Sequence, residues 1–188
     1  MSGSLVLAAL DGHRWASEDA GPVTRVRTLA AMPDPWSRSL LLHLTASAIV
    51  IDPRTGRVLL RWHERQQAWL QVGGHADPGE TDPFRIARRE AREETGLDDL
   101  SAWPDSASPR LIQVAIVSVP PRDPEPAHHH ADLRYVLATG RPERAVPETV
   151  PAQLRWLGID AAISLTGDPG LQVALRRLAP LMTTAIGP

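Results

Sequence analysis

The residues best suited to chemistry are three glutamates, Glu90, Glu93 and Glu94, which lie within five consecutive positions. An α-helix advances about 100° per residue, so Glu93 and Glu94 would fall about 60° and 40° to either side of Glu90, on one face. Three like charges this close repel one another and destabilise a helix. A hard divalent cation such as Mg²⁺ or Mn²⁺ removes that repulsion, because carboxylate oxygens are its preferred ligands. The spacing therefore predicts a metal site on a helix.

The residues around the glutamates predict the helix that carries them. Three apolar residues share another face: Phe84, Ala87 and Ala91. Four arginines occupy the remaining flank: Arg85, Arg88, Arg89 and Arg92. Thr81 or Asp82 is suited to cap the start, Pro83 to the first turn, and Gly96 to the left-handed end of the helix. One face would pack, one would meet water, and one would be acidic.

Glycine, glutamate and arginine surround the three acids in an order that resembles the Nudix box, G-x5-E-x7-R-E-U-x-E-E-x-G-U, where U is aliphatic. The matching residues are Gly74, Glu80, Arg89, Glu90, Glu93, Glu94, Gly96 and Leu97. The pattern has seven residues between its first glutamate and its arginine, whereas this chain has eight, residues 81–88. The extra residue precedes the three glutamates, so their spacing still matches the motif. Only the position of Glu80 relative to Arg89 differs from it.

The similarity to the Nudix family implies a fold and an activity. The implied fold is an α/β/α sandwich with a mixed β-sheet, and the resemblance covers roughly residues 43–165. The implied activity is hydrolysis of the pyrophosphate linkage of a nucleoside diphosphate joined to another group X. Because carboxylates and pyrophosphate repel each other, a metal ion must bridge them, and it also lowers the pKa of the attacking water. We expect Mg²⁺ as the cofactor, with Mn²⁺ as an alternative.

The resemblance also implies roles for single residues. The three glutamates and the Gly73 carbonyl would be metal ligands. Arg89 would orient a glutamate, with Glu80 as its partner. The position of the general base varies across the family, and both Glu94 and a later loop acid, Glu148, remain open.

Three arginines and one histidine are candidates for contact with the substrate: Arg61, Arg65, His75 and Arg134. The two arginines before Trp69 could reach a phosphate, although ordinary surface positions are the simpler explanation. His75 lies directly after the glycine pair, at the expected edge of the site.

Three consecutive histidines, residues 128–130, precede an apolar strand pattern. They fit a polar loop, or a strand in which alternation places His130, Asp132 and Arg134 on one face. Such a face could bind phosphate or shape the mouth of the site. Binding of a transition metal is a third interpretation, although adjacent residues of a strand point to opposite faces.

Composition narrows the classes of function. All 20 basic residues are arginine and cysteine is absent, which excludes a lysine Schiff base, a cysteine nucleophile and disulfides. The net charge is −2 over 188 residues, so no broad basic surface indicates binding of nucleic acid or membranes. No apolar run approaches the length of a membrane span, and the first residues lack the basic segment of a signal peptide. We expect a cytoplasmic enzyme with a small nucleotide derivative as its partner.

Hydrophobic patterning divides the chain into a helical extension, residues 1–38, and a Nudix-type domain, residues 39–188. Strands are expected at residues 43–51, 57–62, 69–72, 111–119, 133–139 and 154–157, and a last helix from residue 168. The extension would cover a face of the sheet or make a homodimer contact.

Two other classes of function share the expected fold. A non-catalytic Nudix-like module that binds nucleotides or regulates would have a degenerate box, whereas all three metal-facing glutamates are present here. An isomerase of the isopentenyl diphosphate type uses a catalytic cysteine, which this chain lacks. Sequence markers of the subfamilies that act on NADH, ADP-ribose and dinucleoside polyphosphates are missing, so the substrate stays open.

Overall fold

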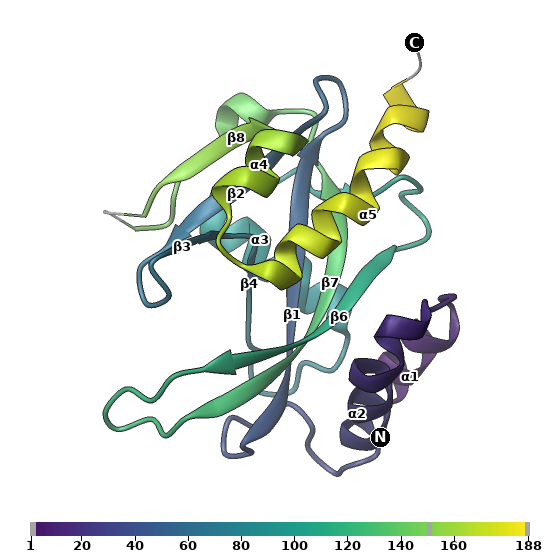
Figure 1. Ribbon diagram of the computed structural model, residues 1–188, viewed down its shortest axis with the longest axis vertical. Coiled ribbons are helices and arrows are strands. Elements are labelled where there is room, and N and C mark those ends of the chain that lie inside the picture. The colour runs from purple at the N-terminus through teal and green to yellow at the C-terminus, as the bar shows by residue number, and fades with distance from the viewer. Residues whose placement is uncertain (1–2, 150–151, 187–188) are drawn as a thin grey trace.

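The computed structural model describes residues 3–149 and 152–186, which form a mixed β-sheet between layers of helices (Figure 1). The strands are β1 (Leu42–Asp52), β2 (Arg57–His63), β3 (Ala68–Leu70), β4 (Val72–Gly74), β5 (Ser101–Ala102), β6 (Leu111–Val119), β7 (His128–Ala138) and β8 (Leu154–Gly158). The helices are α1 (Ser4–Asp11), α2 (Ala20–Ala30), α3 (Pro83–Thr95), α4 (Ile159–Leu165) and α5 (Pro169–Ile186), with the short 3-10 helices η1 (Ser17–Asp19) and η2 (Pro142–Arg144). The predicted α/β sandwich is thus confirmed.

Strand β1 lies at the centre of the sheet. It pairs in parallel with β7, from Leu42 opposite His129 to Ile51 opposite Ala138, and antiparallel with β2 and β4. Strand β6 continues the sheet beyond β7, and β3 and β8 pair with β2. Every residue of β1 after Leu42 is buried, as expected for a strand that is covered on both faces.

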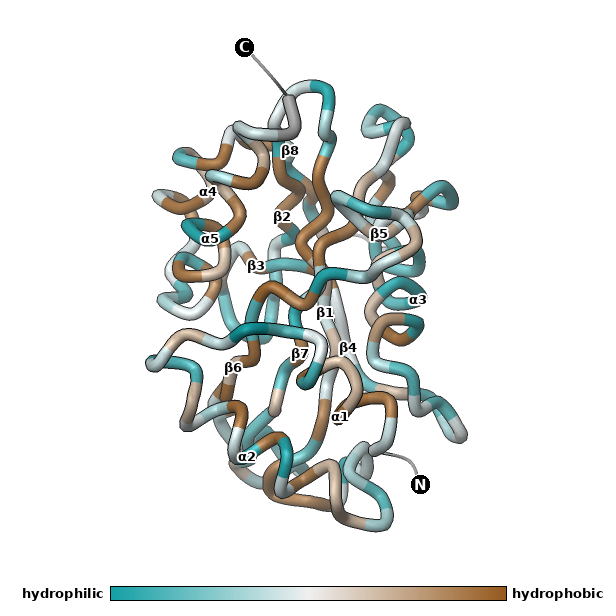
Figure 2. Tube along the Cα trace, turned by 90° about the vertical axis from the view of Figure 1, so that its right-hand side faces the viewer, coloured by the Kyte–Doolittle hydropathy of each residue, from teal (hydrophilic) through white to brown (hydrophobic). Residues whose placement is uncertain are grey.

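Alternate residues of β1 contribute to two apolar cores, one on each face of the sheet. Leu44, Ala46 and Ala48 pack with helices α1, α2 and α3. Ile49 and Ile51 pack with helices α4 and α5 on the other face. Figure 2 shows α3 on one side of the sheet and the pair α4 and α5 on the other. The period of two along the strand thus decides which residues each helical layer covers.

Helices form in the N-terminal segment as the sequence predicts. Val6 and Leu10 of α1 and Val26 of α2 are fully buried in the core that also contains α3. The segment therefore covers a face of the sheet. The homodimer contact and the domain boundary after residue 38 stay predictions. The two predicted domains also include a few residues outside the described part of the chain, namely residues 1–2, 150–151 and 187–188.

Three features differ from the expected elements. The expected strand at residues 69–72 is two short strands, because β3 pairs with β2 while β4 pairs with β1. The short β5 and α4 are not expected from the sequence, because so few residues show no clear periodicity. Residues 128–130, for which a loop was one interpretation, begin strand β7, where β1 and β6 pair with them on both sides. None of the described helices is both long enough and apolar enough to cross a membrane.

Candidate active site

Two glycines bring strand β4 close to its neighbours. Gly73 has a φ of 147°, which favours glycine, and a side chain there would collide with the backbone of Ser47 in β1. A Cβ atom on Gly74 would lie 2.6 Å from Oε2 of Glu90. The carboxylate of Glu90 therefore lies directly against the backbone of the glycine pair.

Helix α3 begins and ends as the sequence predicts. Oδ1 of Asp82 accepts hydrogen bonds from the backbone N–H groups of Phe84 and Arg85, at 3.0 and 3.2 Å. Pro83 occupies the first position of the helix, and Gly96 ends it with a φ of 67°. These signals fix the length of the helix that presents the glutamates.

The buried face of α3 differs in part from the predicted apolar stripe. Ala87 and Ala91 are fully buried, as predicted, but Ile86 is fully buried as well. Phe84 is only half-buried, because it lies at the edge of this face, where its ring centroid is 5.5 Å from that of Tyr135. This packing holds the helix against the sheet.

The guanidinium group of Arg89 joins the parts of the site. It donates to the carboxylate of Glu80 at 2.8–3.1 Å, to Oε1 of Glu90 at 3.0 Å and to Oε2 of Glu93 at 2.8 Å. It also donates to the backbone oxygen of His75 at 2.8 Å. The predicted contact between Glu80 and Arg89 is thus present, and one side chain ties the loop before α3 to the helix.

Glu94 is held from the side of the sheet. The backbone N–H of Gly73 donates to its Oε2 at 3.0 Å, and Nη1 of Arg61 in β2 lies 3.2 Å from its Oε1. Arg61 was a candidate for substrate contact, and in the structure its partner is this carboxylate. Its Nε atom is buried without a hydrogen-bond partner among the described residues.

Burial determines the electrostatics of two of the glutamates. The side chains of Glu90 and Glu94 are 17% and 13% exposed, whereas that of Glu93 is 49% exposed. Loss of hydration raises the pKa of Glu90 and raises the pKa of Glu94 to about 7. The hydrogen bonds between Arg89 and Glu80 lower the pKa of Glu80 and raise the pKa of Arg89.

The charges of this group suit a hard divalent cation. Five carboxylates lie within 3.6 Å of two guanidinium groups: Asp77, Glu80, Glu90, Glu93 and Glu94 with Arg61 and Arg89. Five negative charges less two positive charges leave three negative charges when all five carboxylates are ionised, so a divalent cation would reduce the excess of negative charge. A cation here would also lower the pKa of Glu94 again. Among the described residues, the oxygens of Glu90, Glu93 and Glu94 do not form a group that lies within 4.8 Å, so an ion that takes all three would have to draw their carboxylates together.

The other predicted site residues lie at different places. Glu148 is exposed after η2, and its charge adds to the raised pKa of Glu94. Arg65 pairs with Glu125 of the β6–β7 hairpin at 2.6 Å. The side chain of His75 contacts other imidazoles instead of the carboxylates.

A buried polar network that the sequence predicts only in part surrounds Arg134, whose side chain is only 2% exposed. Its Nε donates to Asp132 and its Nη1 to Gln113, both at 3.0 Å. Asp132 also accepts from the hydroxyl groups of Thr45 and Ser47 in β1, at 3.1 and 2.8 Å. Thr45, Ser47, Asp132 and Arg134 line a cavity of about 80 Å³ that extends to the glycines of β4. Strand alternation predicts the shared face of Asp132 and Arg134, but the hydroxyl groups opposite them depend on the parallel pairing of β1 and β7.

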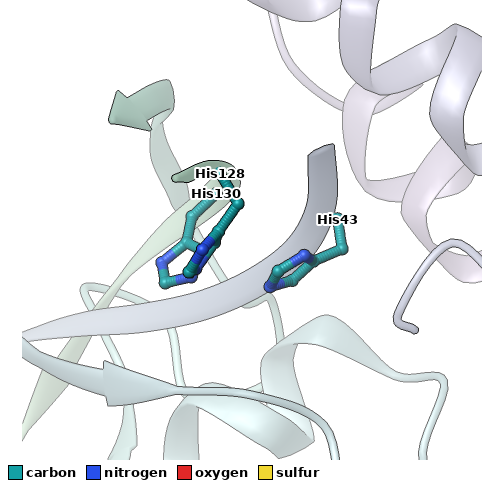
Figure 3. A group of neighbouring side chains, drawn as sticks. All are labelled: His43, His128 and His130. Carbon is teal, nitrogen blue, oxygen red and sulfur yellow. The ribbon is translucent and has the colours of Figure 1, made fainter. Parts of the chain in front are cut away.

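A group of four imidazoles is the second unexpected feature. Its members are His43, His75, His128 and His130. Among the described residues, the ligand atoms of His43, His128 and His130 form the one group of three suited to a metal that lies within 4.8 Å (Figure 3). Burial lowers the pKa of His75 to about 3 and that of His130 to about 4. The spacing of the histidines in β7 signals two of these residues, whereas nothing in the sequence near His43 signals the third.

The fold and the acidic helix agree with a family model. The model of the NUDIX domain matches residues 41–178, which include the glycine pair, the helix α3 and most of the sheet. The chain therefore belongs to the Nudix family and is a Nudix hydrolase.

Solved structures show the same fold. An Ap4A hydrolase from C. elegans is 16% identical with a TM-score of 0.57, covering 74% of this chain and 96% of that chain. A NUDIX-family hydrolase from Clostridium perfringens is 23% identical with a TM-score of 0.55, covering 74% and 97%. The E. coli dihydroneopterin triphosphate pyrophosphohydrolase is 19% identical with a TM-score of 0.52, covering 71% and 92%. A comparison with curated proteins found no match. At these identities the similarity is one of fold.

Proposed function

We propose that this Nudix hydrolase cleaves the pyrophosphate linkage of a nucleoside diphosphate joined to another group, in a reaction that requires Mg²⁺ or Mn²⁺. The proposed metal ligands are Glu90, Glu93, Glu94 and the Gly73 carbonyl. Two of the similar structures are named as a hydrolase of Ap4A and as a pyrophosphohydrolase of dihydroneopterin triphosphate, which supports a substrate of this chemical class.

The hydrogen bonds of Arg89 are the observation that carries this proposal. A single guanidinium group contacts Glu80, Glu90 and Glu93 and so holds the last two in a fixed orientation. Supporting contacts of this kind orient the ligands of metal sites. Glutamates on an ordinary solvated helix face would need no such support.

Each part of the site then has a defined task. When bound, Mg²⁺ supplies positive charge that offsets the carboxylates and the phosphates and makes an attacking water more acidic. Arg89 holds Glu90 and Glu93 from the loop side, and the backbone N–H of Gly73 holds Glu94 from the sheet side. The general base is Glu94 or Glu148.

We assign contact with a substrate phosphate first to Arg61. Of the four candidates, its side chain alone contacts a proposed metal ligand, and its Nε atom keeps an unused donor. Arg134 is the second candidate, because it lines the cavity beside β4. Arg65 and His75 are engaged elsewhere, Arg65 with Glu125 and His75 with other imidazoles.

A panel of nucleoside diphosphate derivatives tests the proposal. We expect the release of a nucleoside monophosphate or of phosphate in the presence of Mg²⁺, and none after a chelator is added. Glu93→Gln should lower kcat by about 100-fold or more, because it removes a charged ligand from an exposed position without disturbing the core. Glu143→Gln, which changes an exposed glutamate of η2 in the same way, should leave kcat unchanged.

The same assay separates the alternatives. Two outcomes contradict the proposed metal site: turnover in the presence of the chelator, and an unchanged rate in Glu93→Gln. Nucleotide binding without turnover of any substrate would favour the non-catalytic module. A lower kcat in Glu148→Gln with an unchanged requirement for Mg²⁺ assigns the general base to Glu148, and an unchanged kcat assigns it to Glu94.

A further inference from the structure

Four imidazoles from three separate segments meet where the β6–β7 hairpin leaves the sheet. His43 is the second residue of β1, His75 follows β4, and His128 and His130 lie at the start of β7. The centroid of the His43 ring lies 5.2, 5.3 and 4.9 Å from those of His75, His128 and His130, respectively. The rings of His75 and His130 are 4.8 Å apart. His43 alternates along β1 with Leu44, which packs in the core that contains α3, so the His43 side chain lies on the opposite face of the sheet. The imidazoles are thus a different set of side chains from the carboxylates, and the backbone oxygen of His75, which accepts from Arg89, joins the two sets.

Strand pairing explains why these residues meet. His43 and His130 are direct partners in the parallel pairing of β1 and β7. Alternation along β7 puts His128 on the same face as His130 and turns His129 to the opposite face, where it is exposed. Figure 3 shows the rings of His128 and His130 together on β7, with the His43 ring directed toward them from β1.

The distances suit a transition-metal ion. A tetrahedral Zn²⁺ ion with Zn–N bonds of about 2.0–2.1 Å requires nitrogen atoms about 3.4 Å apart. The Nε2 atoms of His128 and His130 are 3.1 Å apart, and so are those of His43 and His75. The ligand atoms of His43, His128 and His130 all lie within 4.8 Å of one another, so small side-chain rotations are enough to bring them around one ion.

In His43 and His128, a hydrogen bond of Nδ1 to a backbone oxygen leaves Nε2 directed at the other imidazoles. Nδ1 of His43 contacts the backbone oxygen of Leu40 at 2.9 Å, and Nδ1 of His128 contacts that of Pro126 at 2.9 Å. A carbonyl oxygen can only accept, so each Nδ1 carries a hydrogen and each Nε2 of the neutral ring keeps its lone pair. Metal-binding histidines are commonly held by this same contact between the second ring nitrogen and a backbone carbonyl.

The imidazoles border a cavity, and the positive charges near them are offset or exposed to solvent. The histidines line a cavity of about 200 Å³, which Arg38, Arg65 and Glu125 also border. The positive charge of Arg65 is offset by Glu125 at 2.6 Å, and Arg38 is exposed to solvent, which screens its charge.

We propose that this group binds one divalent transition-metal ion, with Zn²⁺ as the reference ion, through Nε2 of His43, His128 and His130, with His75 as the fourth ligand. Nitrogen ligands favour such an ion over Mg²⁺, which the carboxylates of α3 suit better. A site filled by four protein ligands has a structural role. The ion joins the base of the hairpin to β1 and to the residue whose carbonyl accepts from Arg89.

Calorimetric titration of the metal-stripped chain with Zn²⁺, in a form without a histidine tag and with millimolar Mg²⁺ present, tests this site. We expect one bound equivalent that Mg²⁺ does not displace. With Co²⁺ as the probe, the visible absorption should be that of a tetrahedral site with nitrogen ligands. His128→Gln and His130→Gln should each weaken binding by about 100-fold or more, because loss of a ligand costs at least as much as loss of a supporting contact.

The controls use the same chain. His129→Gln lies on the same strand but on the exposed face, and it should bind Zn²⁺ as the wild type does. Glu93→Gln should also retain Zn²⁺ binding, so the result does not depend on the proposed hydrolysis. Circular dichroism checks that each variant is folded. His128, which is partly exposed, is a safer position to change than the buried His43. Absence of a stoichiometric Zn²⁺ ion, or equal loss in His129→Gln and His130→Gln, would overturn the proposal.

Discussion

Among single residues, Arg89 shows what a guanidinium group can do that an ammonium group cannot. Its five N–H donors lie in one plane, and the structure directs them to Glu80, Glu90, Glu93 and the carbonyl of His75. A lysine has three donors at the end of a flexible chain. It can neutralise one carboxylate but cannot orient all of them at once.

We therefore predict that Arg89→Lys keeps the positive charge and still loses activity. The value of kcat should fall by about 10- to 100-fold, because the carboxylates are no longer held in one orientation. Steady-state kinetics at saturating Mg²⁺ measure the effect. Arg88→Lys changes an exposed arginine of the same helix and should have wild-type kinetics. A wild-type kcat in Arg89→Lys would show that the orientation of the carboxylates does not depend on the guanidinium.

The sequence predicts contacts within a local segment better than contacts between distant strands. Glu80 and Arg89 lie on one loop and the helix that follows, so motif and helical geometry predict their contact. The contact of Arg61 with Glu94 requires β2 and α3 to meet through β1 and β4, and spacing along the chain contains no such information. In the same way, His43 joins His130 only through the parallel pairing of their strands.

At the scale of elements, the strands with a sustained apolar pattern were predictable. The ends of β1, β2 and β6 lie within one residue of the predicted ends, because several alternating or β-branched residues signal each strand. Strand β7 begins at His128, five residues before its predicted start, because polar residues hide its first part. Backbone pairing with β1 and β6, rather than hydrophobicity, makes that part a strand.

The turn between β1 and β2 depends on Asp52, whose side chain is fully buried. Its carboxylate accepts from the hydroxyl of Thr55 at 2.6 Å and from the backbone N–H of Arg54 at 3.1 Å. Burial acts to raise the pKa of Asp52, but these hydrogen bonds outweigh it and leave the pKa below its ordinary value of 3.8. The ionised carboxylate is therefore more stable in the folded chain than in the unfolded chain.

We predict that Asp52→Asn lowers the free energy of unfolding at pH 7 by about 1.5–3 kcal/mol, the usual contribution of hydrogen bonds to a charged group. The stabilisation by Asp52 is fully present above pH 3.8 and is lost as the pH falls through the lower pKa of the folded state. Urea denaturation at several pH values should show the difference from wild type shrinking below about pH 4. Asp34→Asn, at an exposed position, is the control. A difference that grows with acidity would contradict this sign.

At the scale of the whole molecule, the N-terminal helices are part of the core that supports α3. We predict that Leu10→Ala lowers the free energy of unfolding by about 2–5 kcal/mol, because Leu10 is fully buried. Leu5→Ala makes the same chemical change on the same helix at a residue that is 46% exposed, and it should cost much less. Urea denaturation measures both. Equal effects of the two changes would mean that the extension folds independently of the sheet.

The parallel pairing of β1 with β7 also affects the order in which the chain can fold. It joins residues 42–51 to residues 129–138, so the central strand gains this neighbour only after most of the chain has been synthesised. Pairing between such distant segments is slow, because a large loop must close before any contact rewards it. Until then, the backbone N–H and C=O groups on one edge of the apolar strand β1 are unpaired, and an exposed strand of this kind can pair with another chain. Nascent chains released before β7 emerges from the ribosome would therefore be the species most prone to aggregation.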